Sequence, residues 1–196
     1  MTPTARPRAA PGHPADAARN ATAARRRPMN AEQYNRWSAP FRGPGAAKSL
    51  ARANRITTMT FYVLYPILLI ALALQWNPLF IPCLVTPAVT FVGLSTFRKR
   101  INAPRPYEVL DIDPVIKKDT RGKSFPSRHV FSAFVITMCW LAYSPLAGGA
   151  LLALGVVVGV IRVCGGVHFP KDVIGGALMG SACGIAGVIL PAMFLL

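Results

Sequence analysis

Long stretches without charge are the feature that most constrains the fold of this chain. A helix needs about 20 apolar residues to cross a bilayer core of about 30 Å, and five stretches reach or approach that length. They predict an all-α fold, a polytopic membrane helical bundle with about five transmembrane helices. The alternative is a soluble all-α protein whose helices are fully buried. The stretches are Thr57–Trp76, Leu79–Phe97, His129–Tyr143, Ala147–Val163 and Val173–Leu196.

The first 56 residues have a different composition. Arginine, alanine and proline dominate there, and the segment carries eleven of the 22 lysine and arginine residues. Such a segment cannot bury enough apolar surface to order itself, so we expect a disordered basic tail through about residue 28. The charge favours a solvated tail with weak attraction to anionic lipid headgroups over an arm that binds nucleic acid. We therefore divide the chain into a tail, 1–56, and a membrane domain, 57–196, with no nucleic-acid partner.

Residues 30–55 contain the few large apolar side chains of this segment. Tyr34, Trp37 and Phe41 stand among polar and basic residues. Aromatic side chains of this kind anchor helices in the plane of a membrane surface. We therefore expect a short interfacial helix within 30–55.

The basic residues are all on one side of the predicted membrane topology. With five helices, the tail and the loops Arg98–Arg128 and Val163–Asp172 face the same side, and every lysine and arginine lies there or at that boundary. The positive-inside rule places this face in the cytoplasm. The expected location is a bacterial plasma membrane.

Glycines recur at four-residue intervals in two of the apolar stretches. Gly155 pairs with Gly159, and Gly176, Gly180 and Gly184 form a second series. Small residues at this spacing let membrane helices approach closely. We interpret them as packing contacts within one chain. A homo-oligomer that uses the same glycine-rich faces is the alternative.

Three short polar segments, which we call the polar islands, interrupt the apolar chain. They are Arg98–Pro106, Pro126–His129 and Arg162–Asp172, and each adjoins a predicted membrane helix. Ionisable groups at a bilayer edge are costly, so they indicate a functional site.

The third island holds His168 and, four residues later, Asp172. A neutral imidazole is a good nucleophile or base, and a carboxylate on its other nitrogen fixes the tautomer and stabilises the cation. Pro170 marks a helix start, which places Asp172 in the first helical turn and His168 just before it. The two side chains are therefore expected to meet at the membrane surface.

The second island begins a helix, and free N–H groups at a helix N-terminus bind anions. Ser127 can add a hydroxyl donor or act only as a helix cap, Arg128 adds a charge, and His129 can protonate a departing oxygen. The first island supplies Arg98 and Arg105, whose planar guanidinium groups match phosphate oxygens.

Together the islands suit phosphoryl transfer, in which cations hold the phosphoryl oxygens, one histidine attacks and the other protonates the leaving group. Arginines can stabilise the charge without a metal ion. The acidic residues Glu108, Asp111 and Asp113 lack histidine partners, so we expect neither a metal site nor a cofactor.

The order and spacing of the islands resemble the type 2 phosphatidic acid phosphatase family, the lipid phosphate phosphatases related to vanadium haloperoxidases. The first motif of that family is Lys-x6-Arg-Pro. Here six residues separate Arg98 from Arg105-Pro106, with arginine in place of lysine, and the alternative is that Lys99 serves from an offset of one.

The other two motifs are matched with one departure each. Pro-Ser-Gly-His reads here as Pro126–His129, with Arg128 in place of glycine. Ser-Arg-x5-His-x3-Asp is matched from Arg162 to Asp172, with Ile161 in place of serine. The resemblance covers about residues 57–196.

The resemblance implies a role for each matched residue. His168 is the nucleophile that forms a phosphohistidine, Asp172 orients it, and His129 is the acid for the leaving alcohol. Arg128 is expected to narrow the pocket and add charge, which affects the choice of substrate. The phosphate-binding residues are Arg98, Arg105, Ser127, Arg128 and Arg162.

The implied substrate is a lipid phosphate monoester or diphosphate that reaches the site from the bilayer. Phosphatidic acid, phosphatidylglycerol phosphate and polyprenyl mono- or diphosphates all fit. The family usually has six helices and a site outside the cytoplasm, which conflicts with the cytoplasmic face indicated by the charges. The alternative function is a catalytically silent membrane scaffold that binds anionic lipid headgroups.

Overall fold

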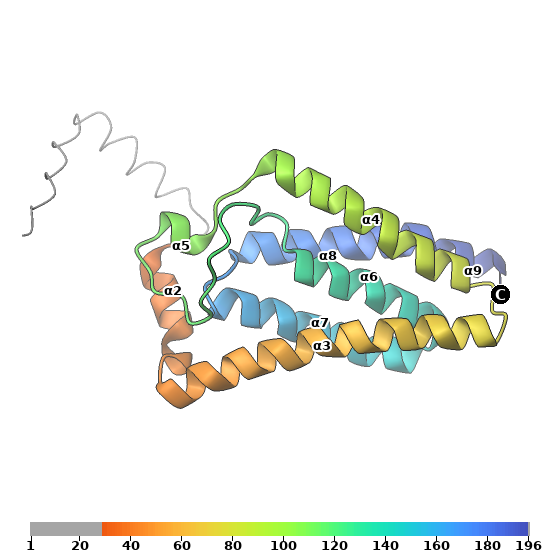
Figure 1. Ribbon diagram of the computed structural model, residues 1–196, viewed down its shortest axis with the longest axis horizontal. Coiled ribbons are helices and arrows are strands. Elements are labelled where there is room, and N and C mark those ends of the chain that lie inside the picture. The colour runs from red at the N-terminus through yellow and green to blue at the C-terminus, as the bar shows by residue number, and fades with distance from the viewer. Residues whose placement is uncertain (1–28, 196) are drawn as a thin grey trace, which may run out of the picture.

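The computed structural model describes residues 29–195, and all regular structure in this range is helical (Figure 1). The predicted all-α class is confirmed for these residues, and the predicted disorder of residues 1–28 lies outside them. The elements are α2 (Ala31–Ser38), the 3-10 turn η1 (Ala39–Phe41), α3 (Pro44–Leu74), α4 (Phe80–Ile101), α5 (Pro106–Val109), α6 (Arg128–Tyr143), α7 (Pro145–Cys164), α8 (Pro170–Gly184), the π-helical turn η2 (Ile185–Ile189) and α9 (Leu190–Leu195).

Four helical segments of the described chain are long and apolar enough to cross a membrane. They are α3, the segment that contains α4, α7, and α8 with its continuation through η2 and α9. The fifth helix of the bundle, α6, has 16 residues and is therefore about 24 Å long at 1.5 Å per residue. This is shorter than a bilayer core, as the length of its apolar stretch predicts.

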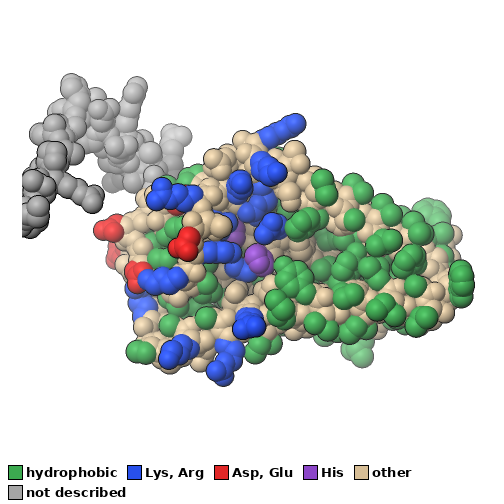
Figure 2. Space-filling model, viewed as in Figure 1, with side chains coloured by type: hydrophobic (Ala, Val, Ile, Leu, Met, Phe, Trp, Pro, Cys, Tyr) green, Lys and Arg blue, Asp and Glu red, His purple; other side chains and the backbone are tan. Residues whose placement is uncertain are grey.

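The outer surface of the bundle carries many exposed apolar side chains, which cover one end in the space-filling view (Figure 2). Val63 on α3, Val89 on α4 and Val160 on α7 are each more than half exposed. A soluble monomer rarely shows an apolar patch of this extent. The surface therefore supports the membrane bundle over the soluble alternative.

The N-terminal part contains a short helix within the predicted range 30–55, and its location at a membrane surface stays a prediction. Only residues 31–38 form a separate helix, α2, which is capped reciprocally by Asn30 and Gln33. Residues 44–56 instead belong to α3, which begins with Pro44 at its first position, where the missing N–H costs nothing. The first membrane helix thus starts 13 residues before the apolar stretch at Thr57.

The short helix α6 lies at the centre of the bundle, packed along α7 and α8 and touching α3, α4 and η2 (Figure 1). Half of its residues are buried. Two glycines of α8 permit the close approach, because a Cβ at Gly176 would lie 2.7 Å from the Ser127 carbonyl oxygen and one at Gly180 would lie 2.6 Å from that of Phe131. These glycines serve packing within the chain.

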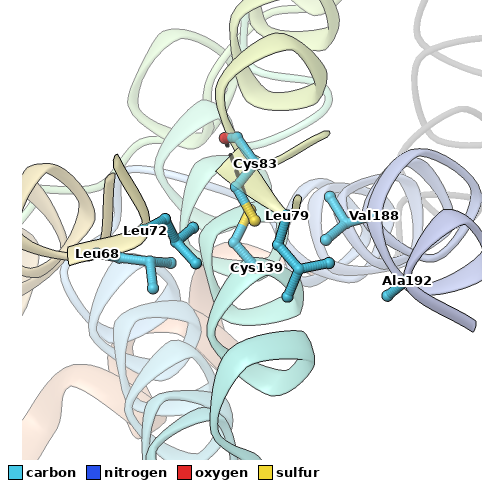
Figure 3. Close-up of a cluster of buried hydrophobic side chains, with 7 residues drawn as sticks. All are labelled: Leu68, Leu72, Leu79, Cys83, Cys139, Val188 and Ala192. Atoms are coloured by element: carbon cyan, nitrogen blue, oxygen red, sulfur yellow. Dashed lines mark hydrogen bonds between the residues drawn. The ribbon is translucent and has the colours of Figure 1, made fainter. Parts of the chain in front are cut away.

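A cluster of buried apolar side chains closes the end of the bundle near the C-terminus (Figure 3). Leu68 and Leu72 of α3 meet Cys139 of α6 and Val188 of η2 there. This cluster joins α3 and α4 firmly beside the turn that connects them.

The opposite end of the bundle gathers the three polar islands, because α4 and α7 end there and α6 and α8 begin there (Figure 1). The connections at the closed end, residues 75–79 and Ser144, carry no lysine or arginine. The bundle is thus polar and cationic at one end only.

The close contact of α8 with α6 leads to a stability prediction. Gly180→Ala should lower the free energy of unfolding by about 1–3 kcal/mol, because its Cβ overlaps a backbone oxygen that cannot move aside easily. Thermal unfolding of the purified protein in detergent measures the change. Gly149→Ala on α7 is the matched control, since nothing lies within 4 Å of its Cβ position. Equal stability of the two variants would contradict the packing role.

Candidate active site

His168 and Asp172 meet at the start of α8, as the sequence predicts. His168 lies in the loop between α7 and α8 and is 2% exposed, and Asp172 is fully buried. The Nδ1 atom of His168 lies 3.5 Å from Oδ2 of Asp172. The same carboxylate oxygen accepts the backbone N–H of Phe169 at 3.0 Å, which fixes Asp172 to the beginning of its own helix.

A third side chain, Ser124, completes this arrangement. Its buried hydroxyl donates to Oδ2 of Asp172 at 2.5 Å and lies 3.3 Å from Nδ1 of His168. Ser124 also donates its backbone N–H to the carbonyl of Ala103, in the first polar island. Ser124 therefore holds the imidazole so that Nδ1 faces the carboxylate and Nε2 points away from it.

The loop environment keeps His168 uncharged at neutral pH. Burial lowers the pKa of His168 to about 4, and the charges of Arg105 and Arg162 act in the same direction. The hydrogen bond and charge of Asp172 oppose this shift but do not cancel it. An uncharged imidazole has a free lone pair on Nε2, which a nucleophile requires.

Arg98 and Arg105, from the first island, are both buried and hold the segment that precedes α6. Arg98 donates from Nη1 to the Pro126 carbonyl and from Nη2 to that of Lys123. Arg105 donates from Nε to Gly122 at 3.1 Å and from Nη1 to the carbonyl of Val167, beside His168, at 3.4 Å. Each guanidinium has five N–H donors, so donors remain for an anion.

Arg162, near the end of α7, positions the nucleophile with its backbone. Its carbonyl accepts the N–H groups of Val167 at 3.1 Å and His168 at 3.2 Å. Its side chain is 2% exposed, and among the described residues Nε of Arg162 has no hydrogen-bond partner. An unpaired buried donor of this kind is costly unless a ligand satisfies it.

Ser127 precedes the first residue of α6 and is fully buried. Its hydroxyl does not cap the helix, and it has no hydrogen-bond partner among the described residues. Ser127 therefore occupies the N-cap position of α6 without a capping hydrogen bond from its side chain. The backbone N–H of Ser127 instead donates to the Asp172 carbonyl at 2.8 Å, which joins the second island to the third.

Arg128 and His129 follow in the first turn of α6. The Arg128 side chain is exposed and its guanidinium lies 5.6 Å from the centre of the Phe91 ring on α4. It also lines a hollow of about 270 Å³ with Arg98 and Arg105. His129 is half-buried and lines a small hollow with Tyr62 of α3.

The eight residues singled out in the sequence thus come together at one end of the bundle, and Figure 2 shows basic side chains gathered around a histidine on this face. Lys99 lines the same hollow as Arg98 and Arg128. Within residues 29–195, no group of three or more histidine, cysteine or acidic side chains is placed to hold a metal ion. Glu108 instead accepts the backbone N–H groups of Arg105 and Gly122.

Two residues of the site were not identified from the sequence. Ser124 is two residues from the nearest matched motif position, and nothing in its spacing sets it apart from other loop serines. Lys118 lies in the 110–127 loop, and the charges of Arg162, Arg105, Arg128 and Arg98 all act on it. Only the folding of this loop across the site brings it near them.

These observations define a class, an integral membrane helical bundle with a cationic histidine site at one end. The sequence pattern of the PAP2 superfamily matches residues 78–194, more than half of the chain, and the chain belongs to that superfamily. The predicted family is thereby confirmed.

Two curated proteins are similar over part of their length. The putative undecaprenyl-diphosphatase YbjG of Escherichia coli is 42% identical over 72 residues, which is 36% of this chain and 36% of that protein. The bacitracin transport permease protein BcrC of Bacillus licheniformis is 40% identical over 57 residues, 29% and 28% of the two chains. The matched part is thus about a third of each relative, and both relatives are bacterial.

Two crystal structures have a similar fold. LpxE of Aquifex aeolicus superposes with a TM-score of 0.66 and 26% identity, over 84% of this chain and 97% of that one. The transmembrane PAP2-type phosphatidylglycerolphosphate phosphatase of Bacillus subtilis has a TM-score of 0.62 and 20% identity, over 83% and 84%. At that identity the second likeness shows the fold alone.

The environment of His168 leads to a prediction about its protonation. In a 15N-histidine NMR titration of the protein in nanodiscs, His168 should be neutral from pH 8 to pH 5, with its proton on Nδ1. The variant His168→Gln assigns the signal. A midpoint near 6.5, or a proton on Nε2, would contradict the arrangement described.

Proposed function

We propose that this chain is a membrane phosphatase that hydrolyses a lipid phosphate monoester or diphosphate through a phosphohistidine, without a metal ion. The observation that carries the proposal is the buried, uncharged His168, held on one side by Asp172 and Ser124 and surrounded by arginines. Membership of the PAP2 superfamily supports the same reaction.

The phosphate is bound before the reaction by donors from all three islands. Arg98, Arg105 and Arg162 supply guanidinium N–H groups, and the unpaired hydroxyl of Ser127 supplies another donor. The first backbone N–H groups of α6, beginning with that of Arg128, point out of the helix N-terminus toward the same place. These fixed donors stabilise the charge that spreads over the phosphoryl oxygens in the transition state.

The reaction then proceeds in two steps. Nε2 of His168 attacks phosphorus, the bond from phosphorus to the leaving oxygen breaks, and His129 gives that oxygen a proton. Asp172 stabilises the positive charge that forms on the imidazole. Water next attacks the phosphohistidine, His129 accepts the proton from the water, and inorganic phosphate leaves with His168 restored.

The lipid part has an apolar route to this site. A groove of about 360 Å³ lies between α3, α4 and α6, lined by Tyr62, Tyr65, Phe91 and Phe131 among others. Tyr62 also lines the small hollow at His129. The helices α3 and α4 diverge from their connecting turn toward the site end (Figure 1), so a lipid tail can occupy the groove from the bilayer.

Three substrate classes are compared in the test. A polyprenyl diphosphate corresponds to the activity for which YbjG is named, and phosphatidylglycerol phosphate is the substrate in the name of the B. subtilis phosphatase, which is similar in fold. Phosphatidic acid represents a simple monoester. Whichever class is preferred, the chemistry at His168 is the same.

The test is phosphate release by the detergent-purified protein from these three substrates, with and without a chelator. We expect hydrolysis of at least one substrate, no effect of the chelator, and a loss of at least about 10³-fold in turnover for His168→Ala because the nucleophile is gone. Lys171→Ala is the control, since this exposed side chain lies beside the site without lining it.

Two outcomes would contradict the proposal. Full turnover by His168→Ala, or loss of activity with the chelator, would exclude the metal-free phosphohistidine mechanism. Binding of anionic vesicles without hydrolysis of any substrate would instead favour the silent scaffold.

A further inference from the structure

The segment 110–127, between α5 and α6, is held in place at two points. Ile116 donates its N–H at 3.1 Å to the carbonyl of Gly165, in the loop that carries His168. Gly122 donates its N–H to Glu108 at 3.0 Å, and its carbonyl accepts from Nε of Arg105 at 3.1 Å. The residues between these points therefore have a defined position relative to the nucleophile.

Lys118 lies in this span with its side chain turned inward. It is half-buried, whereas its neighbours Lys117 and Asp119 are exposed. Lys117 pairs with the Asp113 carboxylate, but no acceptor among the described residues lies within hydrogen-bond distance of the Lys118 ammonium group. A half-buried lysine without a hydrogen-bonded counter-ion has its ammonium donors available for an anion.

The charges that act on Lys118 come from all three polar islands. Burial and the charges of Arg162 on α7, Arg105, Arg128 on α6 and Arg98 on α4 lower the pKa of Lys118 to about 8. Lys118 also lines a hollow with Tyr107, Glu108, Asp119 and Arg121, and Arg121 is shared with the hollow of Arg98 and Arg105. The two hollows are therefore adjacent.

Five cations gather at this site, namely the guanidinium groups of Arg98, Arg105, Arg128 and Arg162 and the ammonium group of Lys118. A phosphate monoester carries a charge of about −1.5 to −2 at neutral pH. The carboxylates of Asp172, Glu108 and Asp119 offset part of the positive charge, and Glu108 and Asp119 line the hollow of Lys118. Because this hollow lies beside the one lined by Arg98 and Arg105, a second phosphate can bind next to the first.

The position of Lys118 assigns it to the leaving-group side. Among the charged groups that act on the ring of His129, Lys118 is second only to Arg162. Since His129 faces the leaving oxygen in the proposed mechanism, Lys118 is next to the part of the substrate that departs.

We propose that Lys118 forms a second phosphate subsite, which binds the lipid-linked phosphate of a diphosphate substrate while His168 attacks the terminal one. In this step the N–P bond forms and the P–O–P bridge breaks. The bridging oxygen leaves with its electron pair and takes the proton of His129, and Lys118 stabilises the remaining negative charge of the lipid monophosphate. The inference rests on the proposed function, and water completes the cycle as before.

The experiment compares farnesyl diphosphate with farnesyl monophosphate, which differ only in the second phosphate. For Lys118→Met, kcat/KM should fall by about 10- to 100-fold for the diphosphate, as expected for the loss of a contact between charged groups, and by less than about threefold for the monophosphate. Lys117→Met is the matched control and should leave both values unchanged, because that side chain is exposed.

A second readout separates charge from structure. In the wild-type enzyme, kcat/KM for the diphosphate should decline as the pH rises through about 8, where Lys118 of the free enzyme loses its proton. Lys118→Arg keeps the charge and should keep the diphosphate preference to higher pH. Equal losses on both substrates for Lys118→Met, or no loss, would overturn the subsite while the phosphatase function stands. Hydrolysis of no lipid phosphate by the wild type would overturn the function itself.

Discussion

The carboxylate of Asp172 is the interaction on which the rest of the site depends. It accepts the Ser124 hydroxyl and the Phe169 N–H and lies against Nδ1 of His168. The backbone carbonyl of the same residue accepts the N–H of Ser127. One residue in the first turn of α8 thus connects the nucleophile to the start of α6, and the close glycine packing of these two helices keeps that connection at a fixed distance.

The two ends of the bundle have different roles, since one holds the helices together and the other contains the site. At the closed end, apolar packing holds α3 and α4 together beside their connecting turn. Toward the other end these helices diverge, and the apolar groove between them and α6 leads to His129. A single scaffold therefore provides both a rigid polar site and an entry from the bilayer, which suits a substrate with an apolar tail and a charged head.

Much of this could be predicted from the sequence, because apolar length defines membrane helices and the spacing of the islands defines the family. The start of α3 at Pro44 was not predictable from hydropathy, since the basic residues Lys48, Arg52 and Arg55 interrupt 44–56, although its alanines favour a helix. The direction of the Arg128 side chain over Phe91 depends on how α4 packs beside α6. Ser124 and Lys118 reach the site only through the folding of a loop, which no local pattern encodes.

The most direct test of the account is to trap the phosphorylated enzyme. A rapid quench with a substrate labelled with 32P on its terminal phosphate should give a label that is stable to alkali and labile to acid, on a peptide that contains His168. The label should be absent from His168→Gln and should form in Asp172→Asn at a much lower rate. A label on another residue would contradict the account. Turnover by the wild type without any covalent label, together with full activity of His168→Gln, would contradict it as well.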